Sequence, residues 1–401
     1  MNWYYAEGEK TVGPLTIDTM RQLHSCGMVI AETLVAREGS QQWTTYAEAF
    51  KAMPGPPPVP GAPPSVPVSA WSRVATGVSS AAGLEKLDGN AAKSVFSGAL
   101  KNKTVEELEE VFAVGTQRTT PPLASVSAAW PTPWVFMRLL MFSVIATVGF
   151  YWALTRFDNP NLYPGWLFMG AFAVPFSVMV FFLETNVLHN VSFHRVLKSF
   201  FMGGLLSLIF ANTLFESTAA AEHFGAVSAG PIEELAKILA VVFIARTWGH
   251  LKWTLNGMLL GAAVGAGFAA FETAGYILGY AMDGVSTSET MIMRACTAPF
   301  THVIWTAASA AALWKHKGGK AFTPAMLIHG PVLRVLLFVM ALHAIWNSSL
   351  TVPFVGGLTA IGLKSLILGI IGWILVLLLI QSGLNQVKAA QSTEQAIPPL
   401  P

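Results

Sequence analysis

Apolar segments long enough to cross a lipid bilayer recur along the chain from Trp134 onward. Each is about 17–25 residues long, which is the length that an α-helix needs to span the hydrocarbon core. Only 11% of the 401 residues are charged, against about 25% in soluble domains, so a wholly soluble fold is excluded. The sequence therefore predicts an all-α polytopic membrane domain over residues 134–382, embedded in the lipid bilayer. We expect about eight transmembrane helices, at 134–155, 165–185, 197–215, 231–248, 256–280, 290–314, 324–346 and 358–381.

The basic residues of the connections favour one side of the membrane. On the opposite side, the connections carry only Arg156. Cytoplasmic connections are enriched in Lys and Arg, and the first residues lack the basic and apolar regions of a signal peptide. We therefore predict that both termini are cytoplasmic. The net charge of +2 gives no indication of nucleic-acid binding. The basic residues on the predicted cytoplasmic side are Arg195, Lys198, Arg246, Lys252, Lys315, Lys317, Lys320 and Lys388.

Residues 1–50 have the pattern of a small soluble α+β module. The aromatic run Trp3-Tyr4-Tyr5 predicts a short strand, and residues 16–26 have the apolar spacing of a helix. Leu34-Val35 and Trp43 are expected to complete its core.

A linker is predicted between this module and the membrane domain, over residues 51–133. Its proline-rich part, 54–67, favours an extended polyproline II conformation and serves either as a spacer or as a ligand of the preceding module. Residues 68–130 are rich in Ala, Ser and Gly, and we expect them to be mostly disordered apart from a short capped helix at 104–112. Residues 383–401 are predicted to form a disordered tail.

Five ionisable side chains interrupt the apolar segments: Glu233 and Glu234 in the fourth, Glu272 in the fifth, His302 in the sixth and His343 in the seventh. One such residue at the bilayer centre costs roughly 2.5–3.5 kcal/mol on insertion scales. The predicted topology places all of them in the outer half of the membrane. Carboxylates and imidazoles together can activate water, so the pattern predicts one polar site for hydrolysis, built by four helices.

Each of these residues also has a structural explanation when it is taken alone. Glu233 follows Gly230-Pro231 in a first helical turn, where the helix dipole favours a carboxylate. Lys237 lies one turn further on the same face and can pair with it. A glutamate such as Glu272 can pair helices, and a single intramembrane histidine is often a hydrogen-bonded packing residue. Their common depth favours a site.

The first module resembles the GYF-like domain found at the front of many bacterial membrane proteins. The resemblance implies a binding module for proline-rich or other extended peptides; the alternative is a small domain whose aromatic residues only form its core. The residues that carry the resemblance are Trp3, Tyr4, Gly8, Gly13, Pro14, Leu23, Gly27, Thr33, Leu34, Val35, Gly39 and Trp43.

Four ordered motifs between residues 225 and 350 resemble those of the PrsW family of bacterial intramembrane proteases, a group related to the prenyl-protein CAAX proteases and to the APH-1 subunit of gamma-secretase. The family usually has Asp at the position of Asn256 and Asn at that of Thr273; the second difference alters how Glu272 is oriented. The motifs are Pro231-Ile232-Glu233-Glu234-Leu235-Ala236-Lys237, the run 261–272 that ends in Glu272, Arg294 with Pro299-Phe300-Thr301-His302, and His343-Ala344-Ile345-Trp346-Asn347.

The resemblance implies an endopeptidase of the bacterial plasma membrane that cuts a membrane-anchored protein near the outer leaflet. Glu233 and Glu234 are the implied catalytic carboxylates, and Glu272, His302 and His343 complete the site. Lys237, Arg294 and Asn347 are expected to support these residues. Arg294 either pairs with a site carboxylate or extends its charge to the interface.

Two hydrolytic mechanisms fit these residues. In the preferred one, a buried glutamate takes a proton from water and the histidines stabilise the oxyanion, without a cofactor. In the other, Glu272, His302 and His343 bind Zn²⁺ and Glu233 or Glu234 is the base.

Two functions of other classes remain open. An APH-1-like membrane scaffold would use the same residues without catalysis. A proton-coupled transporter would use the carboxylates as a relay.

Overall fold

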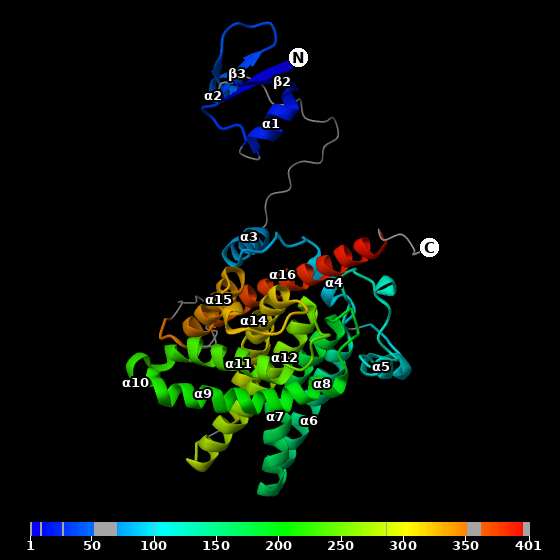
Figure 1. Cartoon of the computed structure of the whole chain (residues 1–401). Coiled ribbons are helices and arrows are strands. Elements are labelled where there is room, and N and C mark those ends of the chain that lie inside the picture. Colours follow the sequence, from blue (N-terminus) through cyan, green and yellow to red (C-terminus); the bar gives the residue numbers. More distant parts are fainter. Residues whose placement is uncertain are drawn as a thin grey trace. The chain divides into compact units, whose positions relative to one another are not determined.

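The computed structural model describes residues 2–8, 10–25, 28–51, 70–99, 101–285, 287–350 and 362–395. The chain divides into two compact units, residues 1–67 and residues 68–401 (Figure 1). Four predictions fall wholly or partly outside the described residues: the polyproline segment 54–67, the predicted helix end at Cys26-Gly27, residues 358–361 of the eighth predicted span, and residues 396–401 of the tail.

The smaller unit is a four-stranded antiparallel sheet with two helices. Its core contains Trp3, Tyr5 and Val35, which confirms the predicted strand. The expectation that Leu34 and Trp43 are core residues is wrong, because their side chains are 46% and 40% exposed. Neighbouring residues of a strand point to opposite faces, so burying Val35 exposes Leu34. In chain order the elements are β1 (Asn2–Glu7), β2 (Lys10–Thr16), α1 (Ile17–Ser25), β3 (Leu34–Arg37), β4 (Thr44–Thr45) and α2 (Tyr46–Lys51), with the sheet order β2-β1-β3-β4.

The expected disorder of residues 68–130 is wrong for most of this stretch. It contains α3 (Ala70–Ala82), α4 (Ala91–Phe96) and α5 (Val105–Phe112), the last of which is the predicted capped helix. The buried faces of α3 and α4 join the core of the larger unit. Alanine is the strongest helix former, so this composition supports helices once an apolar surface is available to cover one face.

Six helices of the described chain are long and apolar enough to cross a membrane. They include most of the predicted spans and make the chain a multi-pass membrane protein. One of them consists of α8 (Phe193–Lys198), a π-helical turn (Ser199–Gly203) and α9 (Gly204–Thr218). The others contain α6 (Val135–Phe157), α7 (Tyr163–Thr185), α12 (Thr254–Met282), α15 (Gly330–Asn347) and α16 (Gly362–Gln395).

The two other predicted spans are shorter helices. The segment predicted at 231–248 is α11 (Ala229–Ala245), with 17 residues. The segment predicted at 290–314 is broken into α13 (Ser288–Thr297) and α14 (His302–Lys317) by a 3₁₀ turn that contains Pro299. Proline lacks a backbone N–H and cannot continue an α-helix without losing a hydrogen bond.

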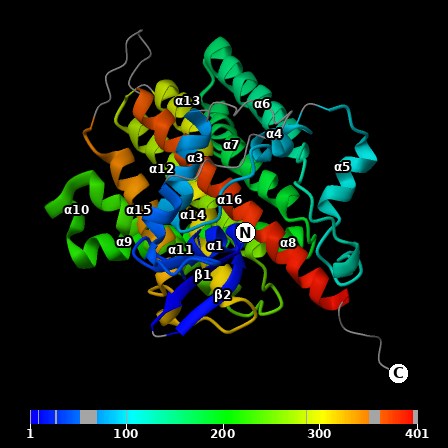
Figure 2. The ribbon, with the colours of Figure 1, turned by 90° about the horizontal axis from the view of Figure 1, so that it is seen from above.

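The long helix α16 also corrects the predicted tail. It continues to Gln395, so residues 383–395 are helical rather than disordered. The side-chain amide of Gln391 donates hydrogen bonds of 2.8 Å to the carbonyl oxygens of Leu123 and Val126, and Val387 is fully buried. These contacts with the segment before α6 keep the helix ordered past its apolar part. Figure 2 shows α16 running diagonally across the larger unit.

The central helix α12 packs against α7, α9, α11, α14 and α16. Gly257, Gly261 and Gly265 lie four residues apart, and a Cβ atom at any of them would overlap atoms of α14. These glycines therefore allow α12 to pack closely against α14. Small residues let two helix backbones approach closely where side chains would hold them apart. This contact fixes α14, and with it His302, against α12.

Candidate active site

Four helices bring the five predicted site residues together around one cavity of about 480 Å³. Glu233 and Glu234 lie on α11, Glu272 on α12 and His343 on α15, while His302 is the first residue of α14. All of them except Glu234 line the cavity. The break before α14 places His302 at a helix start, where its side chain faces the glutamates of α11.

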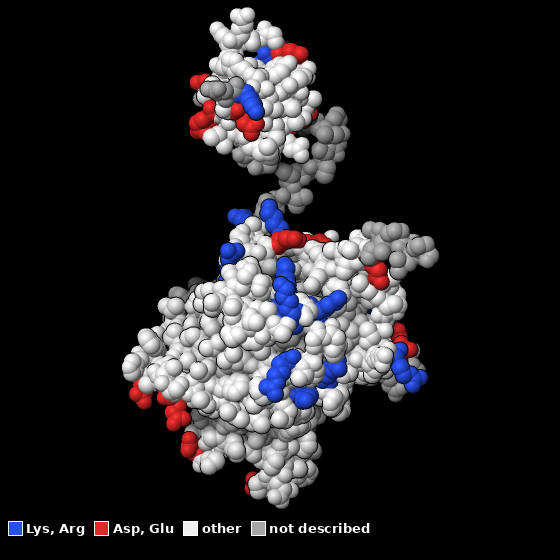
Figure 3. Space-filling view, viewed as in Figure 1, with Lys and Arg blue, Asp and Glu red and all other residues white. Residues whose placement is uncertain are grey.

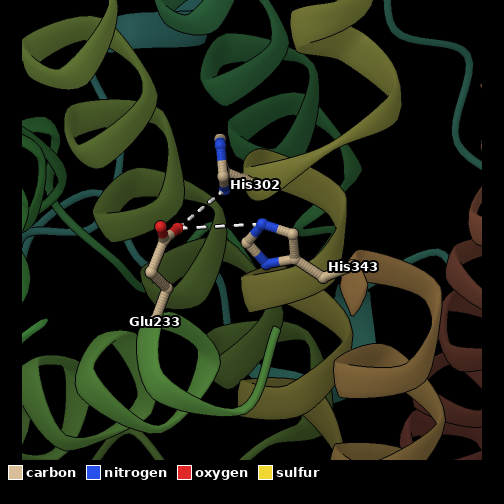
Figure 4. Close-up of side chains that lie close together, drawn as sticks. All are labelled: Glu233, His302 and His343. Atoms are coloured by element: carbon tan, nitrogen blue, oxygen red, sulfur yellow. Dashed lines mark ion pairs between the residues drawn. The ribbon is translucent and has the colours of Figure 1, made fainter. Parts of the chain in front are cut away.

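Glu233 is the glutamate that faces the two histidines. Its Oε2 atom lies 3.8 Å from Nδ1 of His302 and 3.8 Å from Nε2 of His343 (Figure 4). This oxygen is buried and has no hydrogen-bond partner among the described residues. A buried carboxylate oxygen without a partner is costly, so it is available to a proton, a water molecule or a ligand in the cavity.

Glu234 points to the interior of the bundle instead. Its Oε1 atom accepts a hydrogen bond of 2.5 Å from Nζ of Lys237 and one of 2.8 Å from Nδ1 of His343. The side chain is completely buried. Adjacent residues of an α-helix point about 100° apart, which explains why the two neighbouring glutamates have different surroundings. Glu234 orients its neighbours and does not face the cavity.

Lys237 connects the two glutamates to His302. Its side chain is fully buried, and Nζ lies 2.9 Å from Nδ1 of His302 and 3.8 Å from Oε2 of Glu233. The same ammonium lies 4.5 Å from the centre of the Phe268 ring, an arrangement that favours a cation. The predicted pairing of Lys237 with Glu233 is therefore the longer of two ion pairs, and the shorter one is with Glu234.

These contacts assign the protons of both histidines. A Lys ammonium can only donate hydrogen bonds, so Nδ1 of His302 is the acceptor and its proton is on Nε2, which lies 3.2 Å from Oε2 of Glu272. A carboxylate can only accept, so Nδ1 of His343 donates to Glu234. The free electron pair of His343 is then on Nε2, which faces Glu233.

Glu272 is held by Arg294. The two side chains form an ion pair, and Nε of Arg294 donates a hydrogen bond of 2.9 Å to Oγ1 of Thr273. Of the two alternatives for Arg294, the structure has the pairing with a site carboxylate. Thr273 stands where the family usually has Asn, and here it orients Glu272 indirectly, through the arginine. Asn256, the other departure, lies outside the cavity lining.

Asn256 belongs to a separate buried amide network. Its Nδ2 atom donates hydrogen bonds to Oδ1 of Asn190, at 2.6 Å, and to Oδ1 of Asn186, at 3.2 Å. This network joins the start of α12 to the segment that follows α7.

Sequence reasoning missed three aromatic residues of the cavity, Phe215, Trp305 and Tyr276, of which the last two contact predicted site residues. The Trp305 ring lies 4.6 Å from the ring of His343, and the Tyr276 ring lies 4.6 Å from the guanidinium carbon of Arg294. Both line the cavity, together with the predicted supporting residue Asn347. Trp305 and Tyr276 are each one helical turn beyond a predicted residue, so the spacing that relates residues on one helix face would have found these two.

The residues that could hold a metal ion differ from the predicted set. Glu233, His302 and His343 each offer a ligand atom, and these atoms lie within 4.8 Å of one another. Glu233 takes the place expected of Glu272, because the carboxylate of Glu272 forms an ion pair with Arg294. Two imidazoles and a carboxylate are a donor set that zinc accepts, and the unpartnered oxygen of Glu233 fits this role. The ring nitrogen of His302 nearest to Glu233 is, however, hydrogen-bonded to Lys237.

Replacement of Lys237 by leucine is expected to destabilise the fold strongly. The change leaves the buried carboxylate of Glu234 without its cation, and breaking a buried ion pair costs about 3–5 kcal/mol. The purified protein in detergent should therefore melt well below the wild type. Lys315→Leu is the matched control, because Lys315 is exposed. Equal melting temperatures of the two variants would contradict the role of Lys237.

Comparisons with known families agree with this geometry. The family model described as PrsW family intramembrane metalloprotease matches residues 163–380, which include all four helices of the site. The family model GYF domain 2 matches residues 3–49, which make up nearly all of the smaller unit's described elements. No curated protein and no solved structure matches the chain significantly. With more than half of its length matched, including the helices that bring the glutamates and histidines together, the chain belongs to the PrsW family of intramembrane metalloproteases.

Proposed function

We propose that the chain is an endopeptidase that hydrolyses a peptide bond of a membrane-anchored protein near the outer leaflet, with Glu233 as the general base. One observation carries the assignment: a buried, unpartnered carboxylate oxygen faces a cavity between two imidazoles. A general base must be within reach of the water whose proton it takes. Glu233 meets this condition, whereas the described contacts of Glu234 are with Lys237 and His343.

In this mechanism, Oε2 of Glu233 takes a proton from a water molecule as that water attacks the peptide carbonyl. Nε2 of His343, with its free electron pair 3.8 Å away, stabilises the protonated glutamic acid by accepting a hydrogen bond. The same acid then returns the proton to the leaving amine. Glu234 fixes the tautomer of His343 throughout, because it accepts the hydrogen bond from Nδ1.

Two donors at the cavity wall can stabilise the oxyanion of the intermediate: Nε2–H of His302 and the guanidinium of Arg294. Both interact with Glu272 in this structure. A developing oxyanion competes with that carboxylate for them, and donors that are already oriented need little reorganisation. Glu272 therefore holds the donors in place before the reaction.

Glutamic acid catalysis without a metal is the route we favour. The ammonium of Lys237 already engages His302, and it would repel a divalent cation placed between His302 and Glu233. If zinc binds instead, Glu233, His302 and His343 would hold it, and it would supply a bound water that ionises near neutral pH.

Metal dependence can be measured directly. We expect the purified protein to contain zinc well below one equivalent and to keep its proteolytic activity after dialysis against a chelator. Elemental analysis and cleavage assays on the same sample make the comparison. The metal-free mechanism would be contradicted by stoichiometric zinc whose removal abolishes cleavage and whose return restores it. The peptidase assignment would remain.

Glu233→Gln is expected to abolish proteolysis while the protein still folds. Amide replaces carboxylate at nearly constant shape, and loss of a general base lowers rates by about 10²–10⁴-fold. Comparative proteomics of membrane fragments in cells with wild-type or variant protein measures the effect. The control is Glu216→Gln, at an exposed position of α9.

Fragments that persist in the Glu233→Gln cells would contradict the proposal. If the variant keeps all its bound partners and a cellular function without any cleavage, the chain is a scaffold. Proton-coupled flux in liposomes that depends on Glu233 would instead identify a transporter.

The smaller unit is proposed to bind proline-rich or other extended peptides, as its GYF family implies. Support comes from large apolar side chains that it exposes rather than buries, among them Met28, Ile30, Leu34 and Trp43. Large apolar side chains at a surface supply the anchors of a peptide-binding site, and Trp is enriched among such anchors. The peptide comes from a partner or from residues 54–67 of this or a neighbouring chain.

Trp43→Ala should weaken peptide binding at least about tenfold, since aromatic anchors dominate such interfaces. Isothermal titration of the full-length protein with a synthetic peptide of residues 54–67 measures the affinity. Trp71→Ala provides the control, because Trp71 is equally exposed but lies in the larger unit. Unchanged affinity in the Trp43 variant would show that this residue is not part of the peptide site.

The proposed location is the bacterial plasma membrane, with both termini in the cytoplasm. On the face seen in Figure 3, the Lys and Arg side chains of the larger unit lie in its upper and middle parts, which also carry some Asp and Glu, and its lower edge shows Asp and Glu without Lys or Arg. Such an asymmetry supports the positive-inside orientation.

A further inference from the structure

A second cavity, of about 450 Å³, adjoins the active site between α9 and α12. It shares four lining residues with the first cavity: Phe215, Glu233, Glu272 and Tyr276. The proposed base therefore borders both spaces. A polypeptide in the second cavity would pass directly beside the unpartnered oxygen of Glu233, whose residue is only 8% exposed.

Asn212 places a carboxamide in this second cavity. It lies on α9, six residues before the end of the candidate membrane span Phe193–Thr218, and it is exposed. A polar group at this depth is unfavourable in lipid unless it finds a partner. An asparagine amide both donates and accepts hydrogen bonds, which matches the N–H and C=O groups of a peptide backbone. An acyl chain offers neither.

Two glycines form another part of the cavity wall. Gly275 and Gly279 are one turn apart on α12, are exposed, and would have no atom within 4 Å of an added Cβ. In this they differ from Gly257, Gly261 and Gly265 of the same helix, which pack against α14. A glycine inside a helix costs roughly 0.5–1 kcal/mol relative to alanine. At Gly275 and Gly279, packing within the described chain does not offset that cost.

We propose that this second cavity is the docking groove for the membrane-spanning segment of the substrate, an inference that rests on the proposed peptidase function. The segment lies against Gly275 and Gly279, where another backbone can approach closely. Asn212 binds backbone groups of the segment where it leaves helical conformation, and the susceptible bond reaches Glu233.

The length of the groove limits what it recognises. Gly279 is seven residues beyond Glu272, which corresponds to about 10 Å along a helix. That distance accommodates about three residues in extended conformation. The groove therefore selects a short stretch next to the cleaved bond, and the missing side chains at Gly275 and Gly279 leave room for it.

Photo-crosslinking tests docking without requiring cleavage. The full-length chain carries Glu233→Gln and a benzoylphenylalanine in place of Tyr280, which lines the cavity, in liposomes. The probe is a biotinylated synthetic peptide with a span of about 20 Leu and Ala residues, interrupted by Gly-Gly in its outer third. The matched control carries the crosslinker in place of Tyr151, an exposed tyrosine of α6 that does not line the cavity.

We expect at least about fivefold more peptide crosslinked at position 280 than at position 151. Equal yields at the two positions, or adducts with lipid alone at position 280, would overturn the docking groove. Because the assay needs no hydrolysis, it gives its answer even if the protein proves not to be a peptidase.

Cleavage kinetics provide the second test, with the same peptide as substrate. Asn212→Leu and Gly279→Leu should each lower kcat/KM at least about tenfold, mainly through KM, while the melting temperature stays at the wild-type value. Thr213→Val is the matched control, because Thr213 is the exposed neighbour of Asn212 and does not line the cavity. Normal kinetics in both groove variants would overturn the inference and leave Glu233 catalysis standing. Absence of any cleavage by the wild type would instead count against the proposed function.

Discussion

The active site depends on the contacts of one buried group, the ammonium of Lys237. It lies between the carboxylate of Glu234 and the imidazole of His302, at 2.5 Å and 2.9 Å. Without it, Glu234 would be an unpaired charge inside the bundle, which a protein interior does not tolerate. Because the ammonium only donates, it also determines which nitrogen of His302 carries the proton. One cation thus keeps one glutamate ionised and orients one histidine.

The contrast between the neighbouring glutamates follows from this pairing. Oε1 of Glu234 accepts hydrogen bonds from Lys237 and His343, so it acts as a fixed acceptor, while Oε2 of Glu234 is buried without a partner among the described residues. Glu233 faces the cavity with a free oxygen, within 3.8 Å of both histidines. Access to the cavity therefore separates the two glutamates. A site that takes up and releases a proton needs a carboxylate that the cavity reaches, and a site that keeps its shape needs the ion-paired carboxylate beside it. Two consecutive residues of one helix provide both.

Particular elements show how far the sequence could predict the fold. Apolar length predicted most of the spans. The close contact of the α12 glycines with α14 is seen only in the packed structure. The break at Pro299 was missed because the segment was predicted from its apolar length alone. A proline within such a segment either kinks the helix or ends it, and the packing of the neighbouring helices decides which. The helices α3 and α4 were missed for a related reason: Ala- and Ser-rich segments form helices only where an apolar surface covers one of their faces. That surface is built by the larger unit.

The sequence by itself determined which ionisable residues lie in the apolar segments, in what order, and on which helices they come together. Only the tertiary structure decided which of them pair. Lys237 and His302 are 65 residues apart, and Glu234 and His343 are 109 apart; their contacts depend on the rotation of each helix about its axis. The rotation of the helices also pairs Glu272 with Arg294 and places the carboxylate of Glu233 close to both histidines. In a membrane bundle, the side chains on most of a helix's circumference are apolar. Hydrophobic periodicity therefore indicates only roughly which face of the helix is buried. The contact geometry of the packed helices supplies the rest.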